Sequence, residues 1–210
     1  MQTASVIMVG LLLGQAGSTP QQLPQGDEVT VIYFVRHAEV DPTQPTFPLS
    51  AAGRLKADAF ARAVSAVRFT HVFSSHTTRA LQMVEPVALV RNLPVLQLPR
   101  PGVPLDSTLV SDRTSSRAAI GPLVEALRAL PPGSRALVGV NSDNVYAIMN
   151  SLGVPAGTPD QPCPTGGNCV PCLTNACASP RFDQLWLIVL KRGAIPPTLI
   201  ELRYGETGTP

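Results

Sequence analysis

The chain is poor in charged residues and has little excess of either sign. Only 14% of its 210 residues are Asp, Glu, Lys or Arg, and the formal net charge is +2. Proteins that bind nucleic acid or an anionic membrane through their charge carry a larger basic excess. After the first residues, no apolar run is long enough to cross a bilayer. We therefore expect neither a nucleic-acid partner nor a membrane span.

Histidine is also scarce, since the whole chain has only His37, His71 and His76. His37 follows Arg36 at the end of an apolar run, VTVIYFVRHAEV. Such a run predicts a buried strand that delivers a cation and an imidazole to its carboxyl end. Open α/β sheets place ligand chemistry at that end of their strands.

The N-terminal residues resemble an export signal. An apolar stretch from Val6 to Leu13 precedes the small residues Gly14, Ala16 and Gly17, which suit cleavage, although no Lys or Arg precedes the stretch. We expect residues 1–20 to be a signal peptide and the protein to be exported to the periplasm or the extracellular space. The alternative is a short hydrophobic strand or a frayed segment.

The only four cysteines lie within fifteen residues, at Cys163, Cys169, Cys172 and Cys177. An even number in an exported chain indicates two disulfides, for which three connectivities are possible. The alternative is a four-thiolate zinc site, because the pair at 169 and 172 has a spacing that suits tetrahedral zinc. The outer spacings lack the second close pair of a zinc ribbon, so we favour disulfides and expect no metal site.

The hydrophobic patterns predict strands that alternate with helices, and so a three-layer α/β sandwich with a mostly parallel central sheet. We expect one domain, residues 27–210, with a Cys-, Pro- and Gly-rich insertion at 154–181. Helices are expected from near Ser50 and Thr78, over 115–130, and after a cap at Ser142 or Asp143. The predicted strands are 29–35, 71–75, 94–98, 135–140, 182–190 and 197–205.

Three predicted strands end in polar residues. The first ends in Arg36 and His37, the second in Ser74-Ser75-His76 with Arg79 shortly after, and the fourth in Asn141-Ser142-Asp143-Asn144. In a parallel sheet these ends share one edge and can converge. A guanidinium group can bind two oxygens of one phosphate at the same time. A neutral imidazole beside it can attack phosphorus.

At this point the chain resembles the histidine phosphatase superfamily, also called phosphoglycerate mutase-like. RHAE at 36–39 is similar to its RHG-type signature, and LSAAGRLKA at 49–57 to a second motif. SSHTTRALQMVEP at 74–86 and RALVGVNSDNVYAIMNSLG at 135–153 resemble two further motifs in the same order. The resemblance covers about residues 29–205 and implies a phosphoglycerate mutase-like fold that needs no cofactor.

The resemblance also implies roles for individual residues. His37 would be the nucleophile that becomes phosphohistidine, and Arg36 and Arg79 would bind the phosphoryl oxygens. The family's second histidine, after a V-G-H strand, is replaced here by Asn141. An asparagine can donate hydrogen bonds to phosphate but carries no charge. His76 is a candidate to compensate for that loss.

Two function classes remain open. The first is a phosphomonoester hydrolase whose partner is a small phosphorylated substrate or inorganic phosphate. The second is a catalytically degenerate member that binds a phosphorylated or anionic ligand, or a partner protein. A third hypothesis, a metal-binding module built on the four cysteines, would explain residues 163–177 alone. The general acid is unassigned, with Glu39, Asp106, Asp112 and Asp143 as candidates by position.

Overall fold

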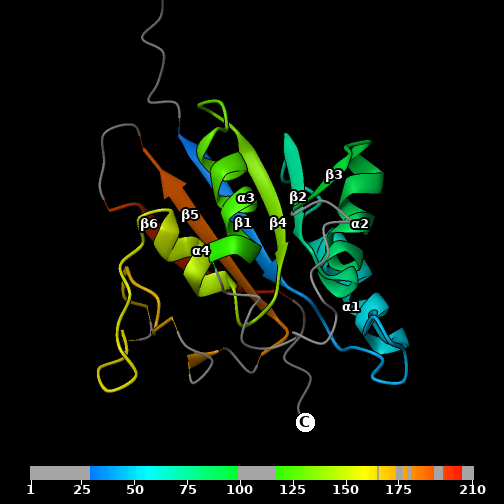
Figure 1. The fold of residues 1–210 in the computed structure, drawn as a ribbon. Coiled ribbons are helices and arrows are strands. Elements are labelled where there is room, and N and C mark those ends of the chain that lie inside the picture. The colour runs from blue at the N-terminus through cyan, green and yellow to red at the C-terminus, as the bar shows by residue number, and fades with distance from the viewer. Residues whose placement is uncertain are drawn as a thin grey trace, which may run out of the picture.

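A six-stranded sheet forms the centre of the molecule, in the order β3-β2-β4-β1-β5-β6 (Figure 1). The computed structural model describes residues 29–98, 117–164, 166–173, 177–178, 181–191 and 196–204. The strands are β1 (Thr30–Arg36), β2 (His71–Ser75), β3 (Val95–Leu98), β4 (Arg135–Val140), β5 (Gln184–Leu190) and β6 (Thr198–Arg203).

The sheet is mixed, although it was predicted to be mostly parallel. The pairs β2–β3, β2–β4 and β1–β4 are parallel, as expected for strands joined by helices. β5 runs antiparallel to both β1 and β6. The predicted positions of the strands are confirmed to within two residues.

Four helices accompany the sheet: α1 (Ala51–Ala63), α2 (Thr78–Arg91), α3 (Arg117–Arg128) and α4 (Val145–Ser151). Ser50 caps α1 as predicted, and its Oγ accepts a hydrogen bond from the Gly53 amide at 3.1 Å. The predicted cap of α4 is wrong. Asn144 occupies the capping position, and its Oδ1 accepts from the Asn141 amide at 3.0 Å instead of capping the helix.

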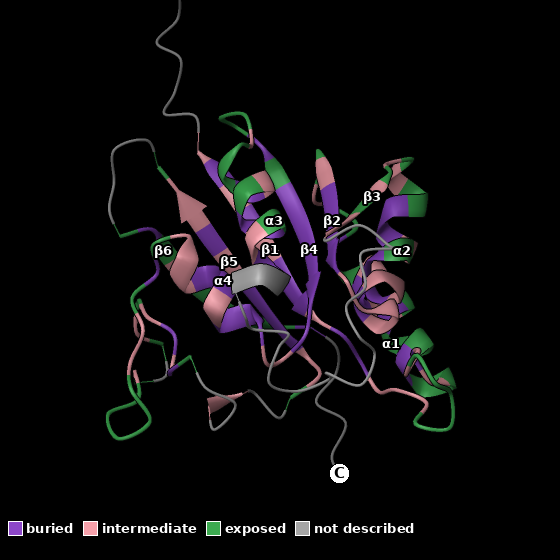
Figure 2. Ribbon diagram, viewed as in Figure 1, coloured by how far each residue is buried: buried purple, intermediate pink, exposed green. Residues whose placement is uncertain are grey.

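The helices bury one hydrophobic cluster on each face of the sheet. Neighbouring residues of β1 point to opposite faces, so Phe34 packs in a cluster with α3 and α4 residues and Val35 in one with α1 and α2 residues. Figure 1 shows α3 and α4 in front of the sheet, and Figure 2 shows that buried residues dominate the central strands β1 and β4. The arrangement is the expected three-layer sandwich.

Two glycines allow backbone segments to approach closely near the carboxyl edge of the sheet. A Cβ at Gly139 in β4 would lie 2.3 Å from the Ala80 carbonyl oxygen, so α2 packs directly on β4. A Cβ at Gly53 would lie 2.2 Å from the Glu39 carbonyl oxygen, so α1 packs on the segment after β1. These contacts fix the start of α2 beside the ends of β1 and β4.

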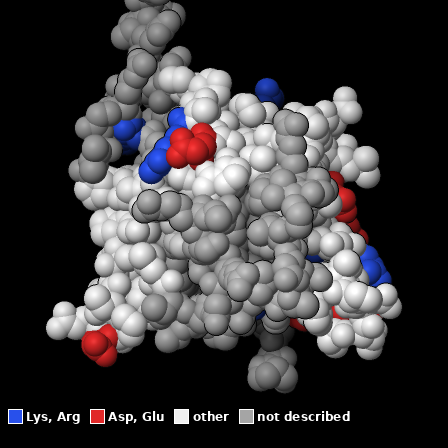
Figure 3. Space-filling view, in the orientation of Figure 1, with Lys and Arg blue, Asp and Glu red and all other residues white. Residues whose placement is uncertain are grey.

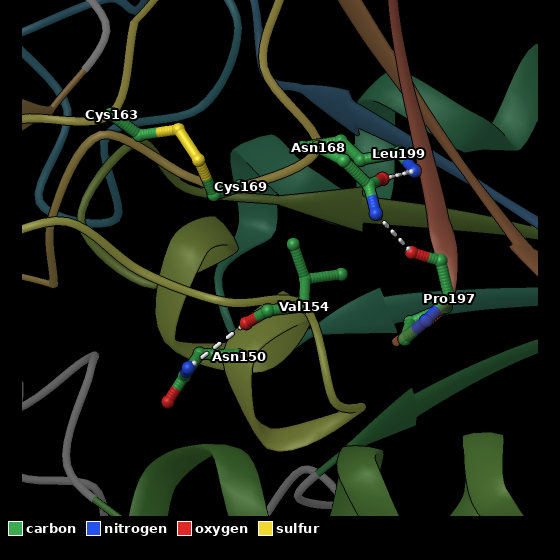
Figure 4. Close-up of a disulfide and its surroundings, with 7 residues drawn as sticks. All are labelled: Asn150, Val154, Cys163, Asn168, Cys169, Pro197 and Leu199. Atoms are coloured by element: carbon green, nitrogen blue, oxygen red, sulfur yellow. Dashed lines mark hydrogen bonds between the residues drawn. A yellow bond between two sulfur atoms is a disulfide. The ribbon is translucent and has the colours of Figure 1, made fainter. Parts of the chain in front are cut away.

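The described residues of the cysteine-rich segment, 154–181, contact β5 and β6. Disulfides join Cys163 to Cys169 and Cys172 to Cys177, which selects one of the three possible connectivities and opposes the four-thiolate alternative. Asn168 anchors the segment to the edge of the sheet, because its side chain donates to the Pro197 carbonyl at 3.0 Å and accepts from the Leu199 amide at 2.6 Å (Figure 4).

The predicted signal peptide, residues 1–20, lies outside the described residues, as do the candidate acids Asp106 and Asp112. Of the helices that the structure describes, none combines the length and the apolar character needed to cross a membrane.

Candidate functional site

The polar ends of β1, β2 and β4 come together at the carboxyl edge of the sheet. Arg36 is the register partner of Val140, the last residue of β4, and the His37 amide donates to the Val140 carbonyl at 3.0 Å. α2 begins beside these ends and brings Arg79 to them. The convergence predicted from the sequence is therefore present, because the three strands are parallel neighbours.

His37 is held in one orientation by hydrogen bonds on both ring nitrogens. Nδ1 lies 2.7 Å from the Ala38 carbonyl oxygen, and Nε2 accepts from Nε of Arg79 at 3.2 Å. A carbonyl can only accept, so Nδ1 carries the proton and Nε2 keeps its lone pair. The side chain thus presents a neutral, nucleophilic nitrogen to the Arg79 guanidinium.

The surroundings of His37 also keep it neutral. The residue is only 8% exposed, and burial lowers its pKa from 6.5 to about 3. The hydrogen bond to Ala38 opposes this shift, whereas the positive charges of Arg79 and Arg36 add to it. The imidazole is consequently unprotonated throughout the neutral pH range.

Arg36 is fixed by a segment far away in the sequence. Its Nη1 donates to the Arg181 carbonyl at 3.0 Å, and its guanidinium lies 4.3 Å from the centre of the Phe182 ring. The buried Tyr204 hydroxyl donates to the Phe182 carbonyl at 2.7 Å, which holds this segment in place. The end of the cysteine-rich segment therefore positions the arginine that precedes His37.

Arg79 and His76 lie near each other at the start of α2. Burial lowers the pKa of Arg79, and burial together with the charge of Arg79 lowers the pKa of His76. His76 Nδ1 is buried and has no hydrogen-bond partner among the residues that the structure describes. His76 is thus neutral near pH 7, and a compensating role for it stays a prediction.

Asn141 is almost fully buried, at 1% exposure, and its side chain links three elements. Nδ2 donates to Oγ of Ser75 at 3.2 Å, and Oδ1 accepts from Oγ1 of Thr77 at 3.0 Å. Thr77 is the N-cap of α2, so the amide joins β4 to β2 and to that helix. One Nδ2 hydrogen is left for another acceptor.

Asp143 is a half-buried carboxyl group in the electrostatic field of both arginines. Burial raises its pKa from 3.8 to about 6, although Arg79 and Arg36 pull it down. Glu39, the other described candidate acid, forms an ion pair with Lys56. Asp143 therefore retains a proton in mildly acidic solution.

The sequence reasoning missed three residues of this cluster. Thr77 could have been found, because a threonine before a helical pattern is a usual cap. Phe182 and Tyr204 carried no such signal. Their contacts with Arg36 and with each other depend on β5 lying beside β1 and on β6 beside β5.

Charge on the visible face is sparse. Among the described residues in the view of Figure 3, a few Lys, Arg, Asp and Glu side chains are visible, and they form no broad patch of either sign. Within the described part of the chain, no group of three or more His, Cys, Asp and Glu side chains could hold a metal ion.

Comparisons with known proteins agree on the type of fold. Residues 32–100 match the model of the histidine phosphatase superfamily, branch 1. No curated protein sequence matches the chain. Among solved structures, a mycobacterial glucosyl-3-phosphoglycerate phosphatase superposes with a TM-score of 0.53 at 16% identity, and the match covers 84% of this chain and 99% of that one.

Two further structures give similar values. The protein histidine phosphatase SixA, complexed with tungstate, has a TM-score of 0.51 at 17% identity over 82% of this chain and 96% of its own. Phosphoserine phosphatase from Entamoeba histolytica has a TM-score of 0.52 at 14% identity over 85% and 98%. The superpositions show that the fold is shared. At sequence identities this low, they do not assign an activity to this chain.

Proposed function

Because residues 32–100 match the model of the histidine phosphatase superfamily, we propose that the chain hydrolyses small phosphomonoesters through a phosphohistidine intermediate on His37. The observation that carries this proposal is the state of the His37 side chain, a neutral imidazole whose Nε2 lone pair faces the guanidinium of Arg79. Such a nitrogen is a competent nucleophile, and a cation beside it attracts the phosphoryl group.

In the first step, substrate phosphate displaces the contact between Arg79 and Nε2. Arg79, Arg36 and the remaining Nδ2 hydrogen of Asn141 bind the phosphoryl oxygens. Nε2 then attacks phosphorus, forming the P–N bond as the P–O bond to the alcohol breaks. The Nδ1 proton stays on the ring, and the Ala38 carbonyl stabilises the charge that develops there.

Asp143 is the proposed proton donor in that step. With a pKa of about 6 it is protonated in mildly acidic solution and can give its proton to the departing alkoxide. In the second step a water molecule attacks phosphorus, the P–N bond breaks, and the water proton returns to the Asp143 carboxylate. Inorganic phosphate and the original form of His37 result.

Asn141 favours a second candidate, a member that binds phosphorylated or anionic ligands without turning them over. Its amide is engaged with Ser75 and Thr77 and cannot supply a positive charge. By analogy with the loss of an oxyanion-hole donor, the missing charge costs a factor of about 100–1000 in rate. Under this alternative the two arginines bind the ligand and His37 is idle.

The two disulfides also support export. Disulfides persist in oxidising compartments and are rare in the cytosol of most cells. With both cysteine pairs joined, we propose that the protein works in the periplasm or outside the cell.

The test is hydrolysis of 4-nitrophenyl phosphate by the purified protein between pH 4 and pH 8. We expect His37→Ala to abolish turnover and the trapped phosphoenzyme, because the variant lacks the Nε2 lone pair that faces Arg79. His71→Ala is the matched control, since His71 lies at the opposite end of β2 and contacts Thr70. It should retain wild-type activity.

The Asn141→His variant separates the two candidates. If the wild type is inert but the variant turns over substrate, the chain is a degenerate enzyme. If both are inert while phosphate or tungstate raises the melting temperature, the site only binds oxyanions. Equal activity in wild type and His37→Ala would refute the phosphohistidine mechanism.

A further inference from the structure

A cavity lies between the cysteine-rich segment and strands β5 and β6. Its volume is about 530 Å³, which is within the range of small-molecule sites. Its described lining includes none of Arg36, His37, Arg79 and Asn141. A ligand held in this cavity is therefore distinct from the phosphate that we propose at those four residues.

Most of the residues that line the cavity are apolar. Trp186 of β5 and Tyr146 of α4 meet edge to face, with ring centroids 5.9 Å apart and planes at 84°. Both side chains are buried, as is Val170 of the cysteine-rich segment, so this part of the cavity is continuous with the hydrophobic core. Leu199 of β6 and the Cys163–Cys169 disulfide also line it. Such a surface favours a ligand with an apolar, ring-bearing body.

The wall that the cysteine-rich segment contributes is fixed to the sheet. The Cys163–Cys169 disulfide closes a short loop that contains Asn168. The Asn168 side chain donates to the Pro197 carbonyl at 3.0 Å and accepts from the Leu199 amide at 2.6 Å (Figure 4). Because the wall is held by these links, little conformational entropy is lost when a ligand enters the cavity.

The polar side chains of the cavity come from neighbouring positions of β5 and β6. Gln184 is the ladder partner of Arg203, and Glu201 lies two residues before Arg203 on the same face of β6. The Gln184 amide donates to Oε1 of Glu201, which leaves Oε2 for another donor. Arg181, which also lines the cavity, is paired with Asp183 at 3.0 Å, so its charge is already compensated.

Glu201 and Arg203 therefore offer one anionic and one cationic group to a ligand. The Arg203 guanidinium makes no hydrogen bond or ion pair with the described part of the chain, although it lies in the electrostatic field of Asp183. Residues two apart in a strand are about 7 Å from each other, so two flexible side chains at this spacing can reach one small molecule. Such a pair complements a zwitterion better than a ligand with a single charge.

We infer that this cavity binds a free α-amino acid with an apolar, ring-bearing side chain. The ammonium group of the amino acid donates to the Glu201 carboxylate, and its carboxylate accepts from the Arg203 guanidinium. Its side chain lies against Trp186 and Tyr146. The inference does not depend on the proposed function, because it assigns no phosphate chemistry to these residues.

The first test compares three ligands by titration calorimetry with the full chain. L-phenylalanine carries both charged groups, 3-phenylpropionate lacks the ammonium group and 2-phenylethylamine lacks the carboxylate. We expect L-phenylalanine to bind and each of the other two to bind about tenfold more weakly or worse, the size of a lost hydrogen bond between charged groups.

The second test assigns each charge to its residue. Glu201→Gln should weaken L-phenylalanine about tenfold or more and should not weaken 3-phenylpropionate, which has no ammonium group. Arg203→Gln should weaken L-phenylalanine by a similar factor and should not weaken 2-phenylethylamine, which has no carboxylate. Glu125→Gln is the matched control and should bind L-phenylalanine as the wild type does, because Glu125 is an exposed carboxylate of α3 that pairs with Arg128.

Three results would each overturn the inference. They are no measurable binding of L-phenylalanine to the wild type, an analogue that binds as tightly as the amino acid, and affinities that neither Glu201→Gln nor Arg203→Gln changes. Circular dichroism establishes whether the variants fold. If either variant is unfolded, the comparison of the three ligands on the wild type decides.

Discussion

At the scale of single residues, Asn141 stands where the family resemblance predicts a histidine. A histidine there would bring a cation to the phosphate. The asparagine instead stabilises the site, because its two side-chain groups satisfy the hydroxyls of Ser75 and Thr77. On the proposed alignment of Asn141 with the family's second histidine, the chain exchanges a catalytic charge for a structural link between β4, β2 and α2.

This structural role predicts the effect of Asn141→Ala. The variant removes the donor to the buried Ser75 hydroxyl and the acceptor of the Thr77 hydroxyl, so we expect the free energy of unfolding to fall by about 2–3 kcal/mol. Chemical unfolding followed by circular dichroism measures it. Asn150→Ala is the comparison, since Asn150 donates only to the Val154 carbonyl and its loss should cost about 1 kcal/mol. Equal losses would contradict the role given to Asn141.

At the scale of the elements, the contact between α2 and β4 decides where Arg79 lies. Gly139 permits this contact, since its missing Cβ leaves room for the Ala80 carbonyl. Arg79 precedes Ala80, so a shift of the helix start would move the guanidinium away from Nε2 of His37. The site therefore requires a glycine at position 139, because a larger residue would prevent α2 from packing on β4.

We accordingly expect Gly139→Ala to destabilise the protein by about 1–3 kcal/mol, as overpacking does, and to weaken phosphate binding as well. Unfolding curves and phosphate-dependent melting temperatures measure the two effects.

The matched change is Gly121→Ala in α3, where no atom lies within 4 Å of the added Cβ. That variant should gain about 0.5–1 kcal/mol from helix propensity. A Gly139→Ala protein as stable as the Gly121→Ala protein would show that α2 does not pack on β4 in this way.

At the scale of the whole molecule, two buried groups act on stability in opposite directions as the pH changes. The pKa of His37 falls from 6.5 to about 3 on folding, so the unfolded chain takes up a proton first and stability declines as the pH drops through that interval. The pKa of Asp143 rises from 3.8 to about 6, so its contribution to stability is lost as the pH increases from about 4 to 6.

The single variants should separate these contributions. As the pH rises from 4 to 7, the stability of Asp143→Asn relative to the wild type should increase. The stability of His37→Gln relative to the wild type should be highest at pH 4 and should decrease over the same interval. Urea unfolding at pH 4, 5, 6 and 7 gives the differences. Curves for both variants that run parallel to the wild-type curve would show that neither group titrates as the structure indicates.

The sequence by itself determined the elements of this protein and the residues that we propose for its chemistry. Hydrophobic periodicity located the six strands, and the order of the motifs selected His37, Arg36 and Arg79, because these signals are local. The parallel arrangement of β1, β2 and β4 then made their convergence predictable.

Only the tertiary structure decided what holds those residues. The contact of Phe182 with Arg36 and the links of Asn141 to Ser75 and Thr77 join segments that are about 60 to 150 positions apart. The reversed β5 also escaped prediction, because strand direction depends on the route of the chain between strands. Contacts of this kind follow from packing, which no local pattern encodes.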